Sequence, residues 1–442
     1  MTKVTVHDQL PGTGKSTKMI DQINNSPTDE KWIVVAPFLS ECHRYAGTIV
    51  DDISGDKQTP VRDDKGFVVY TGEGCSKSGR RFHHPQSGYQ TKVEHIAQLV
   101  SEGKDIVTTH AALKLFTPET IKDVKDAGYR LLIDEELECI KPHNVKAHRR
   151  HMLLKSGVVY EDELGLLRWN PDCPIDYDTK ESDETGFSWD MQIKALCDNG
   201  SLVLIPDGKG DRELFMWEYP IEFLRAFDQI DILTYLFEGS VFERYLKFYG
   251  LDVVVEKGIM LPEDVFSLIQ IVDNPKMNRV GERDMVFSAT DQKKYTKESA
   301  VSKAVRDNLY NFFVNNTYGK SDMSQRLWTC LQSAQPVFKG SGYTKRYIPH
   351  NVKAVNDYVD TKQLAYIYNA NLHPDVYNYL FKRGDDFTPE KDRYALSELI
   401  QWMFRSRIRC KDADIQDRQI SLYIPSSRMR NILIDWMEGK YT

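Results

Sequence analysis

The sequence predicts an α/β protein with more than one domain, and three observations support this prediction. Short apolar runs alternate with segments of helical periodicity through residues 1–140. A glycine-rich turn separates the first apolar run from the first helical segment. The chain has 442 residues, more than one hydrophobic core usually organises. Because strands buried on both faces read as continuous apolar runs, the expected sheet is parallel.

The first elements are a strand at 4–6, a turn, and a helix that begins near Lys15. The turn lies in HDQLPGTGKST, residues 7–17, and matches a phosphate-binding loop except that Gln9 replaces the first glycine. Backbone amides at the helix N-terminus would face phosphate oxygens. Lys15 would reach the β- and γ-phosphates, and Ser16 would bind Mg²⁺. The alternative is an ordinary glycine turn with a surface lysine. The nucleotide-binding residues are therefore expected to be Gln9, Pro11, Gly12, Thr13, Gly14, Lys15, Ser16 and Thr17.

Three further strands are expected at 32–37, 106–110 and 129–134, the first two of them followed by helical segments at 38–50 and 111–116. The strand at 129–134 ends in acidic residues, at the edge where parallel sheets bind ligands. Asp134 there can hold Mg²⁺, and Glu135 can orient or deprotonate an attacking water. The alternative is a surface strand end without a metal role.

Composition limits the class of protein. A net charge of −7 argues against a protein that coats nucleic acid by bulk electrostatics. Seven scattered cysteines fit a reducing cytosol, and the sequence shows no signal peptide and no membrane-spanning run. A cytoplasmic protein without a membrane partner is expected. The acid-rich segment 161–190 is interpreted as a solvated loop or lid.

Four segments in order, PGTGKST, VVAPFLSE, IVTTHAAL and LLIDEEL, resemble motifs I, Ia, Ib and II of the superfamily 1 and 2 helicases. The arginine-rich segment ALSELIQWMFRSRIRCK, followed by a strand at 420–424 and a closing helix, is similar to the region of motif VI. The stretch GYTKRYIPHNVKAVNDY resembles the second domain of small helicases encoded by bacteriophages.

This resemblance implies two RecA-like domains, with ATP and Mg²⁺ in the cleft between them. It implies single-stranded nucleic acid across their tops, with DNA favoured over RNA and other replication proteins as candidate partners. A monomer in the host cytoplasm is expected.

Two motifs depart from the helicase pattern. Motif III has two candidates, the Ser-Ala-Thr at 288–290 and the apolar strand that ends near Thr234. The Thr234 strand is preferred because it has a strand–helix context. In motif VI, Phe404 stands where a glycine is usual, with Gln401 before it and Arg405 and Arg409 after it.

The two motif VI arginines, Arg405 and Arg409, are four residues apart, which on a helix would place both on one face, aimed at the γ-phosphate as arginine fingers. The alternative is that they form salt bridges to Glu398 or to the acidic loop 385–392.

The expected organisation has four parts. They are a RecA-like domain at 1–140, an insertion at 141–220, the rest of domain 1 with a linker at 221–320, and a second RecA-like domain at 321–442. The insertion follows motif II, LLIDEEL, which is also called the Walker B motif. The expected function is an ATP-dependent helicase or translocase that acts on DNA in phage replication or recombination. Two alternatives stay open: a P-loop ATPase of another class, such as a packaging-type motor or a nucleotide kinase, and a non-catalytic nucleotide-gated module. A water-activating acid at Glu135 argues against the second.

Overall fold

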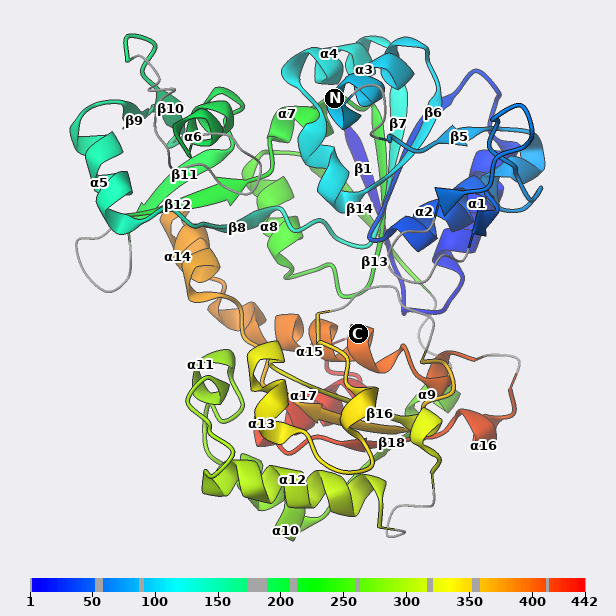
Figure 1. Ribbon diagram of the computed structural model, residues 1–442, viewed down its shortest axis with the longest axis vertical. Coiled ribbons are helices and arrows are strands. Elements are labelled where there is room, and N and C mark those ends of the chain that lie inside the picture. Colours follow the sequence, from blue (N-terminus) through cyan, green and yellow to red (C-terminus); the bar gives the residue numbers. More distant parts are fainter. Residues whose placement is uncertain are drawn as a thin grey trace.

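The structure of the protein is a computed structural model that describes residues 2–51, 59–86, 91–173, 189–206, 213–258, 263–315, 321–351, 358–410 and 413–441. Figure 1 shows a large α/β domain above, an accessory module beside it, and a second α/β domain below. The predicted fold class is confirmed, because both α/β domains have parallel sheets and a separate module follows the strand that ends in Asp134. Among the described residues, no helix combines the length and apolarity needed to cross a bilayer. Half of the acid-rich segment 161–190, residues 174–188, lies outside the described residues.

Domain 1 is built on a parallel sheet of seven strands in the order β14-β1-β13-β7-β2-β6-β5. The apolar runs of its inner strands are buried, as in Ile33 and Val34 of β2, whereas Val254 of the edge strand β14 is exposed. The strand β13 lies between β1 and β7, so the loops after these three strands meet at one edge of the sheet. The strands are β1 Lys3–Asp8, β2 Lys31–Ala36, β5 Phe82–His83, β6 Asp105–Thr109, β7 Tyr129–Asp134, β13 Gln229–Thr234 and β14 Asp252–Lys257.

Helices cover both faces of this sheet. On one face lie α1 Lys15–Asn25 and α2 Leu39–Ala46; on the other lie α3 Lys92–Ser101, α4 Pro118–Asp126, α7 Ile221–Arg225 and α8 Val241–Phe248. Capping residues begin several of them: the Thr91 side chain caps α3 in a reciprocal pair with Glu94, and Ser240 caps α8. The expected helix at 38–50 ends at Ala46, because Gly47 takes a left-handed conformation with φ of 64°.

The expected helix at 111–116 is instead the 3₁₀ helix η2, His110–Leu115. The remaining short elements of domain 1 are β3 Val50–Asp51, β4 Thr59–Pro60 and the 3₁₀ helix η1 Gly74–Ser78.

The accessory module follows β7 and occupies the range predicted for an insertion. Its three-stranded antiparallel sheet has the order β11-β12-β8, and β9 and β10 form a separate hairpin. The elements are β8 Ile140–His143, α5 Ala147–Lys155, β9 Val159–Glu161, β10 Leu167–Trp169, α6 Trp189–Asp198, β11 Leu202–Pro206 and β12 Glu213–Glu218. The helix α14, Pro374–Lys382, packs on β8 and β11 although it follows a strand of the second domain (Figure 1).

Domain 2 has a four-stranded parallel sheet in the order β15-β18-β17-β16. Its strands are β15 Ile269–Ile271, β16 Arg326–Cys330, β17 Gln363–Ile367 and β18 Ile420–Tyr423. Its helices are α9 Glu263–Ser267, α10 Pro275–Asn278, α11 Ala289–Gln292, α12 Ala300–Phe313, α13 Gln335–Phe338, α15 Lys391–Met403, α16 Ile415–Arg418 and α17 Ser427–Met437.

The strand β15 lies in the range 221–320 that the sequence assigns to domain 1 and a linker, yet it pairs with β18. The second sheet therefore begins well before residue 321, because only its partner strand makes the short run Ile269–Ile271 part of a sheet.

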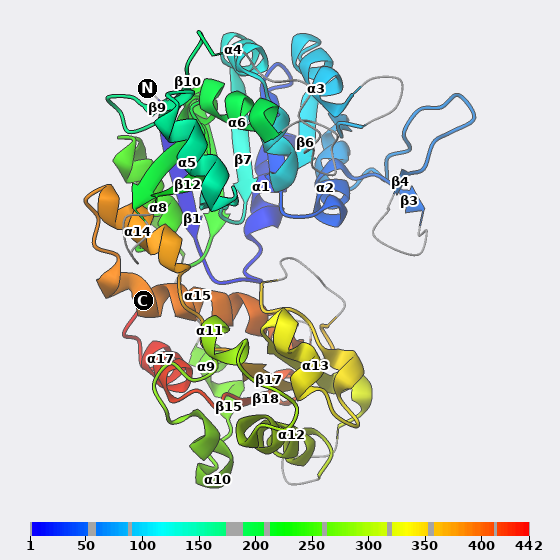
Figure 2. The ribbon, with the colours of Figure 1, turned by 60° about the vertical axis from the view of Figure 1, so that its left-hand side comes forward.

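The two α/β domains are in direct contact. Leu10 of the glycine-rich loop and Leu236 after β13 belong to the hydrophobic cluster of domain 2. The Trp436 indole donates a hydrogen bond of 2.8 Å to the Tyr235 hydroxyl. The helix α15 runs along the boundary between the domains in both views (Figures 1 and 2). Loops at the carboxyl edge of the first sheet are thus fixed partly by the second domain.

Candidate functional site

The glycine-rich loop joins β1 to the N-terminus of α1. Gly12 and Gly14 have φ of 81° and 90°, a left-handed conformation that favours glycine. Gln9 has no such conformation, and its amide donates to the Thr234 carbonyl at 3.0 Å. A side chain is therefore tolerated at the position where the usual pattern has its first glycine. The loop presents the start of an 11-residue helix, whose free amides and dipole favour an anion.

Lys15 lies at the first turn of α1. Its ammonium donates to the backbone carbonyls of Gln9 and, at 3.3 Å, of Leu10. Burial lowers the pKa of Lys15 to about 8, although the carboxylates of Asp134, Asp8 and Glu135 act in the opposite direction. A polyanion in the loop would supply the negative charge that a buried ammonium needs.

Asp134 and Ser16, the two residues expected to hold Mg²⁺, are in contact. The Ser16 hydroxyl donates to Asp134 Oδ2 at 3.3 Å, and the Tyr45 hydroxyl donates to the same oxygen at 2.9 Å. Burial, and then the neighbouring Glu135 carboxylate, raises the pKa of Asp134 to about 6. One hydroxyl and one carboxylate are hard oxygen ligands of the kind Mg²⁺ uses beside phosphate oxygens, so these residues fit that ion.

Glu135 follows β7 with φ of 64°, which is unusual for a residue with a side chain. Its amide donates to the Leu233 carbonyl of β13 at 2.9 Å, and this bond holds the left-handed turn. The same turn places Glu135 on the wall of the cleft beside Asp134. Backbone strain of this kind costs on the order of 1–3 kcal/mol and is concentrated at functional sites.

The two motif III candidates lie far apart. Thr234, at the end of β13, lines the cleft, and its hydroxyl donates to Glu136 Oε1 at 3.0 Å. Ser288 lies in domain 2, where its side chain accepts from the Asp291 amide at 3.3 Å and caps α11. Thr234 therefore shares the cleft with the other candidate residues and Ser288 does not, while the assignment of motif III to the Thr234 strand stays a prediction.

Helix α2 adds a group of residues that the sequence analysis did not identify. Glu41 and Arg44 line the cleft and pair with each other at 2.7 Å, and Arg44 Nη2 lies 3.8 Å from Asp134 Oδ2. Tyr45 is fully buried beneath them. No local sequence signal identifies them, because they reach Asp134 only where β2 lies beside β7 in the sheet.

Domain 2 closes the cleft with Gln401 and Arg409. A Cβ placed on Gly12 would lie 3.5 Å from the Arg409 Cβ, so the two domains approach closely at the glycine-rich loop. The cleft has a volume of about 360 Å³.

The expectation that Arg405 and Arg409 share one helical face is wrong. Helix α15 ends at Met403, and Arg407–Arg409 form a separate 3₁₀ turn. The cause is the Arg407 amide, which donates to the Thr361 carbonyl at 3.0 Å and draws the chain away from the helix axis.

The two arginines consequently have different environments. Arg409 lines the cleft, whereas Arg405 is 4% exposed. Burial lowers the pKa of Arg405 to about 10, against the opposing effects of Glu135 and Glu398. Within the described part of the chain, neither guanidinium lies within 4.0 Å of a carboxylate, so the alternative of structural salt bridges finds no support there.

The chain is similar to known proteins over its C-terminal part and over its whole length. Residues 263–437 match the family described as "YonV C-terminal Rossmann-like domain". Over its whole length the chain is 25% identical, across 457 aligned residues, to the whole of the "SPbeta prophage-derived uncharacterized protein YonV" of Bacillus subtilis (strain 168). A solved structure, that of S. tokodaii Xpd4, aligns with 98% of this chain and 94% of its own, with a TM-score of 0.41 and 11% identity.

Proposed function

We propose that this protein is an ATP-driven translocase that acts on single-stranded nucleic acid, with DNA favoured over RNA. One observation carries the proposal: a single cleft contains Lys15, Ser16, Asp134 and Glu135 of domain 1 opposite Gln401 and Arg409 of domain 2. A site completed by two domains couples the state of the nucleotide to the relative position of those domains. A nucleotide kinase has no need of the second domain. The similarity to a prophage-derived protein supports a phage setting, in which we propose a role in DNA replication or recombination.

Each residue in the cleft has a role in the proposed hydrolysis. The loop amides and Lys15 bind the phosphates, and Glu135 orients the water that attacks the γ-phosphorus and accepts its proton. The bond between that phosphorus and the bridging oxygen of ADP breaks, and ADP leaves. Ser16 and Asp134 would hold Mg²⁺, which supplies charge stabilisation on the phosphate oxygens. Arg409 faces this charge from domain 2.

The test is the rate of ATP hydrolysis with and without single-stranded DNA. We expect strong stimulation by the strand in the wild type and loss of turnover in Lys15→Ala. Lys18→Ala is the matched control, because Lys18 is exposed on the same helix and does not line the cleft. A wild-type rate that ignores nucleic acid would favour a P-loop ATPase of another class. Full turnover in a folded Lys15→Ala protein would refute the phosphate-loop assignment.

Substitutions of Glu135 and Asp134 distinguish ATP hydrolysis from ATP binding. Glu135→Gln should still bind ATP and Mg²⁺ but hydrolyse ATP very slowly, because the amide cannot accept the proton of water. Asp134→Asn should weaken Mg²⁺-dependent ATP binding. Identical behaviour of the two variants would show that the roles are assigned wrongly.

A further inference from the structure

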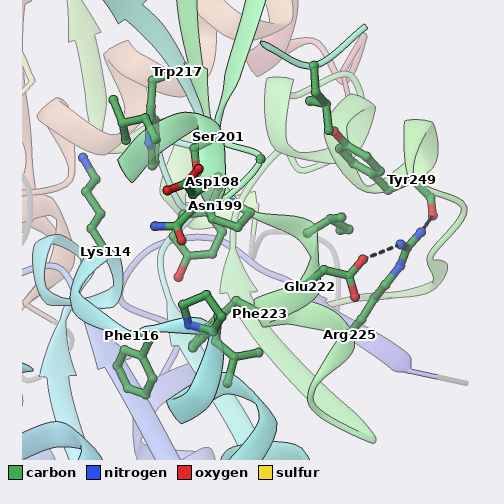
Figure 3. Close-up of a pocket in the computed structure, with 18 of the residues that line it drawn as sticks. Lys114, Phe116, Asp198, Asn199, Ser201, Trp217, Glu222, Phe223, Arg225 and Tyr249 are labelled. Atoms are coloured by element: carbon green, nitrogen blue, oxygen red, sulfur yellow. Dashed lines mark hydrogen bonds and ion pairs between the residues drawn. The ribbon is translucent and has the colours of Figure 1, made fainter. Parts of the chain in front are cut away.

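A second cavity, of about 680 Å³, lies between domain 1 and the accessory module (Figure 3). Its walls come from η2 and α4, from α7, from the end of α8, from β12 and from the turn between α6 and β11. This volume is within the range of about 300–1,000 Å³ that organic ligands occupy in proteins. No residue of this cavity lines the cleft described above.

The inner wall of the cavity is aromatic. Phe116 and Phe223 meet edge to face with ring centroids 5.1 Å apart, Tyr219 meets Phe223 at 5.6 Å, and Trp217 meets Tyr219 at 5.9 Å. These rings come from domain 1 and from the accessory module, so the wall exists only where the two are packed together. Such a surface suits a flat, apolar group.

Most cations of the cavity are already neutralised. Arg168 pairs with Asp162 at 2.7 Å, Arg225 with Glu222 at 2.9 Å, and Arg383 with Glu218 at 3.1 Å. Lys114 also lines the cavity, but no carboxylate of the described residues lies within 4.0 Å of its ammonium.

A second lysine, Lys141, lies beside Lys114 but outside the cavity lining. The ammonium of Lys114 lies 4.3 Å from the centre of the Trp217 ring, and that of Lys141 lies 5.4 Å from the same ring. Burial, and then the adjacent Lys141, lowers the pKa of Lys114 to about 8, which Glu138 only partly opposes. Lys141 forms an ion pair with Glu138 at 3.7 Å, which leaves Lys114 as the cavity-lining cation that a bound anion would neutralise.

The turn after α6 adds hydrogen-bonding groups. Figure 3 shows Asn199 and Ser201 at the cavity, with Asn199 extending toward the side on which Lys114 lies. Asn199 is exposed, so its amide can bond water, and the edge of a nucleobase could replace that water because it can both donate to the amide and accept from it.

We propose that this cavity binds one nucleotide unit, with its phosphate at Lys114 and its base against the aromatic wall. The inference extends the proposed function, because a strand on which the protein acts would supply such a unit. A free mononucleotide has the same chemistry and is the second source.

Binding is measured in Lys15→Ala protein, in which the phosphate loop is disabled. Fluorescence anisotropy follows a labelled oligothymidylate, and equilibrium dialysis follows thymidine 5′-monophosphate. Adding Lys114→Ala should weaken binding about tenfold, as expected for the loss of a charged hydrogen bond. Lys122→Ala is the control, because it removes an exposed lysine of α4 outside the cavity and should leave affinity unchanged. Asn199→Ala is a second variant, which leaves the charge intact.

The source is identified by photocrosslinking an oligonucleotide that carries 4-thiothymidine. Crosslinks to peptides containing Phe116 or Trp217 assign the cavity to the strand. Lys114-dependent binding of the mononucleotide alone assigns it to a free nucleotide. Unchanged affinity in both Lys114→Ala and Asn199→Ala, with crosslinks only outside the cavity, overturns the proposal. The motor is tested separately by strand-stimulated hydrolysis in protein with an intact Lys15, so either hypothesis can fail alone.

Discussion

At the scale of single residues, Asp134 is the point where three elements meet. Its Oδ2 accepts hydrogen bonds from Ser16 on α1 and from Tyr45 on α2, and it sits at the end of β7. Because both donors use the same oxygen, the carboxylate is held in one orientation before any ion arrives. Groups that orient a metal ligand in this way typically change metal affinity about 10–100-fold when removed.

Tyr45→Phe should therefore raise the Mg²⁺ concentration needed for half-maximal hydrolysis by about tenfold, with little loss of stability, since the buried ring is kept. The measurement is a magnesium titration of ATPase rate at saturating ATP. Tyr129→Phe is the matched control: Tyr129 is also fully buried, and its hydroxyl donates to the Lys104 carbonyl at 2.8 Å, away from the cleft. An unchanged magnesium requirement in Tyr45→Phe would show that the tyrosine has no positioning role.

Arg409→Lys should keep ATP affinity but lower turnover by about 10³-fold, because lysine retains the charge without the planar fork that matches phosphate oxygens. Steady-state hydrolysis and nucleotide binding are measured on the same protein. Arg407→Lys is the control, since Arg407 pairs with Asp417 and Asp360 and does not line the cleft. Near wild-type turnover in Arg409→Lys would require the arginine finger to be sought elsewhere, with Arg405 as the next candidate.

At the scale of elements, α14 links domain 2 to the accessory module. Its Val376, Tyr379 and Leu380 belong to the hydrophobic cluster of domain 1 and the accessory module. Glu218 of β12, 1% exposed, accepts hydrogen bonds from Tyr249 and Tyr379 and forms an ion pair with Arg383, just after α14. Removing one partner from a buried charge network of this kind strongly destabilises a protein, because the other charge stays buried without a counter-charge.

Glu218→Gln should destabilise the protein by about 3 kcal/mol, because Arg383 would keep its charge in a buried site without a carboxylate. Urea unfolding followed by circular dichroism measures the change. Glu222→Gln is the control: the exposed pair of Glu222 and Arg225 should contribute at most about 1 kcal/mol. If both substitutions lower the free energy of unfolding equally, the Glu218 network does not hold α14 in place.

At the scale of the whole molecule, the chain passes more than once between the two domains and the accessory module. The accessory module interrupts domain 1 between β7 and β13, and α14 interrupts domain 2 between β17 and α15. Arg244 of α8 pairs with Asp385 at 3.5 Å and with Glu390 at 3.4 Å, so the segment after α14 is also held by domain 1. Movement between the two α/β domains must therefore move or strain α14 and the accessory module.

Residues 263–442 produced alone should self-associate, because the apolar face of α14 would lose its cover. Light scattering coupled to size-exclusion chromatography measures the mass. Val376→Ser with Leu380→Ser should restore a monomer, whereas Phe381→Ser should not, since Phe381 is already 69% exposed in the whole chain. A monomeric wild-type fragment would indicate that α14 does not depend on the accessory module for burial.

Local sequence patterns are sufficient to predict part of the structure. Alternating apolar runs and helical segments predict the α/β class, and the sequence around Gly12, Gly14 and Lys15 predicts a strand–turn–helix that suits phosphate. The acids after β7 are predicted in the same way, because a buried parallel strand delivers its next residues to the ligand edge. These features depend on residues that are neighbours in sequence, so local patterns are enough to predict them.

The remaining features depend on contacts between residues that are distant in sequence, so they follow from the fold of the whole chain. Tyr45 contacts Asp134, which lies 89 positions later in the chain. This contact exists only because β2 lies beside β7. The arginine spacing suggested one helix, but a backbone bond from Arg407 to Thr361 ends it. Of the two motif III candidates that the sequence left open, the Ser-Ala-Thr segment lies in domain 2, where the Asn369 amide donates to the Phe287 carbonyl at 3.0 Å. Strand order and burial are properties of the whole chain, and no local pattern specifies them.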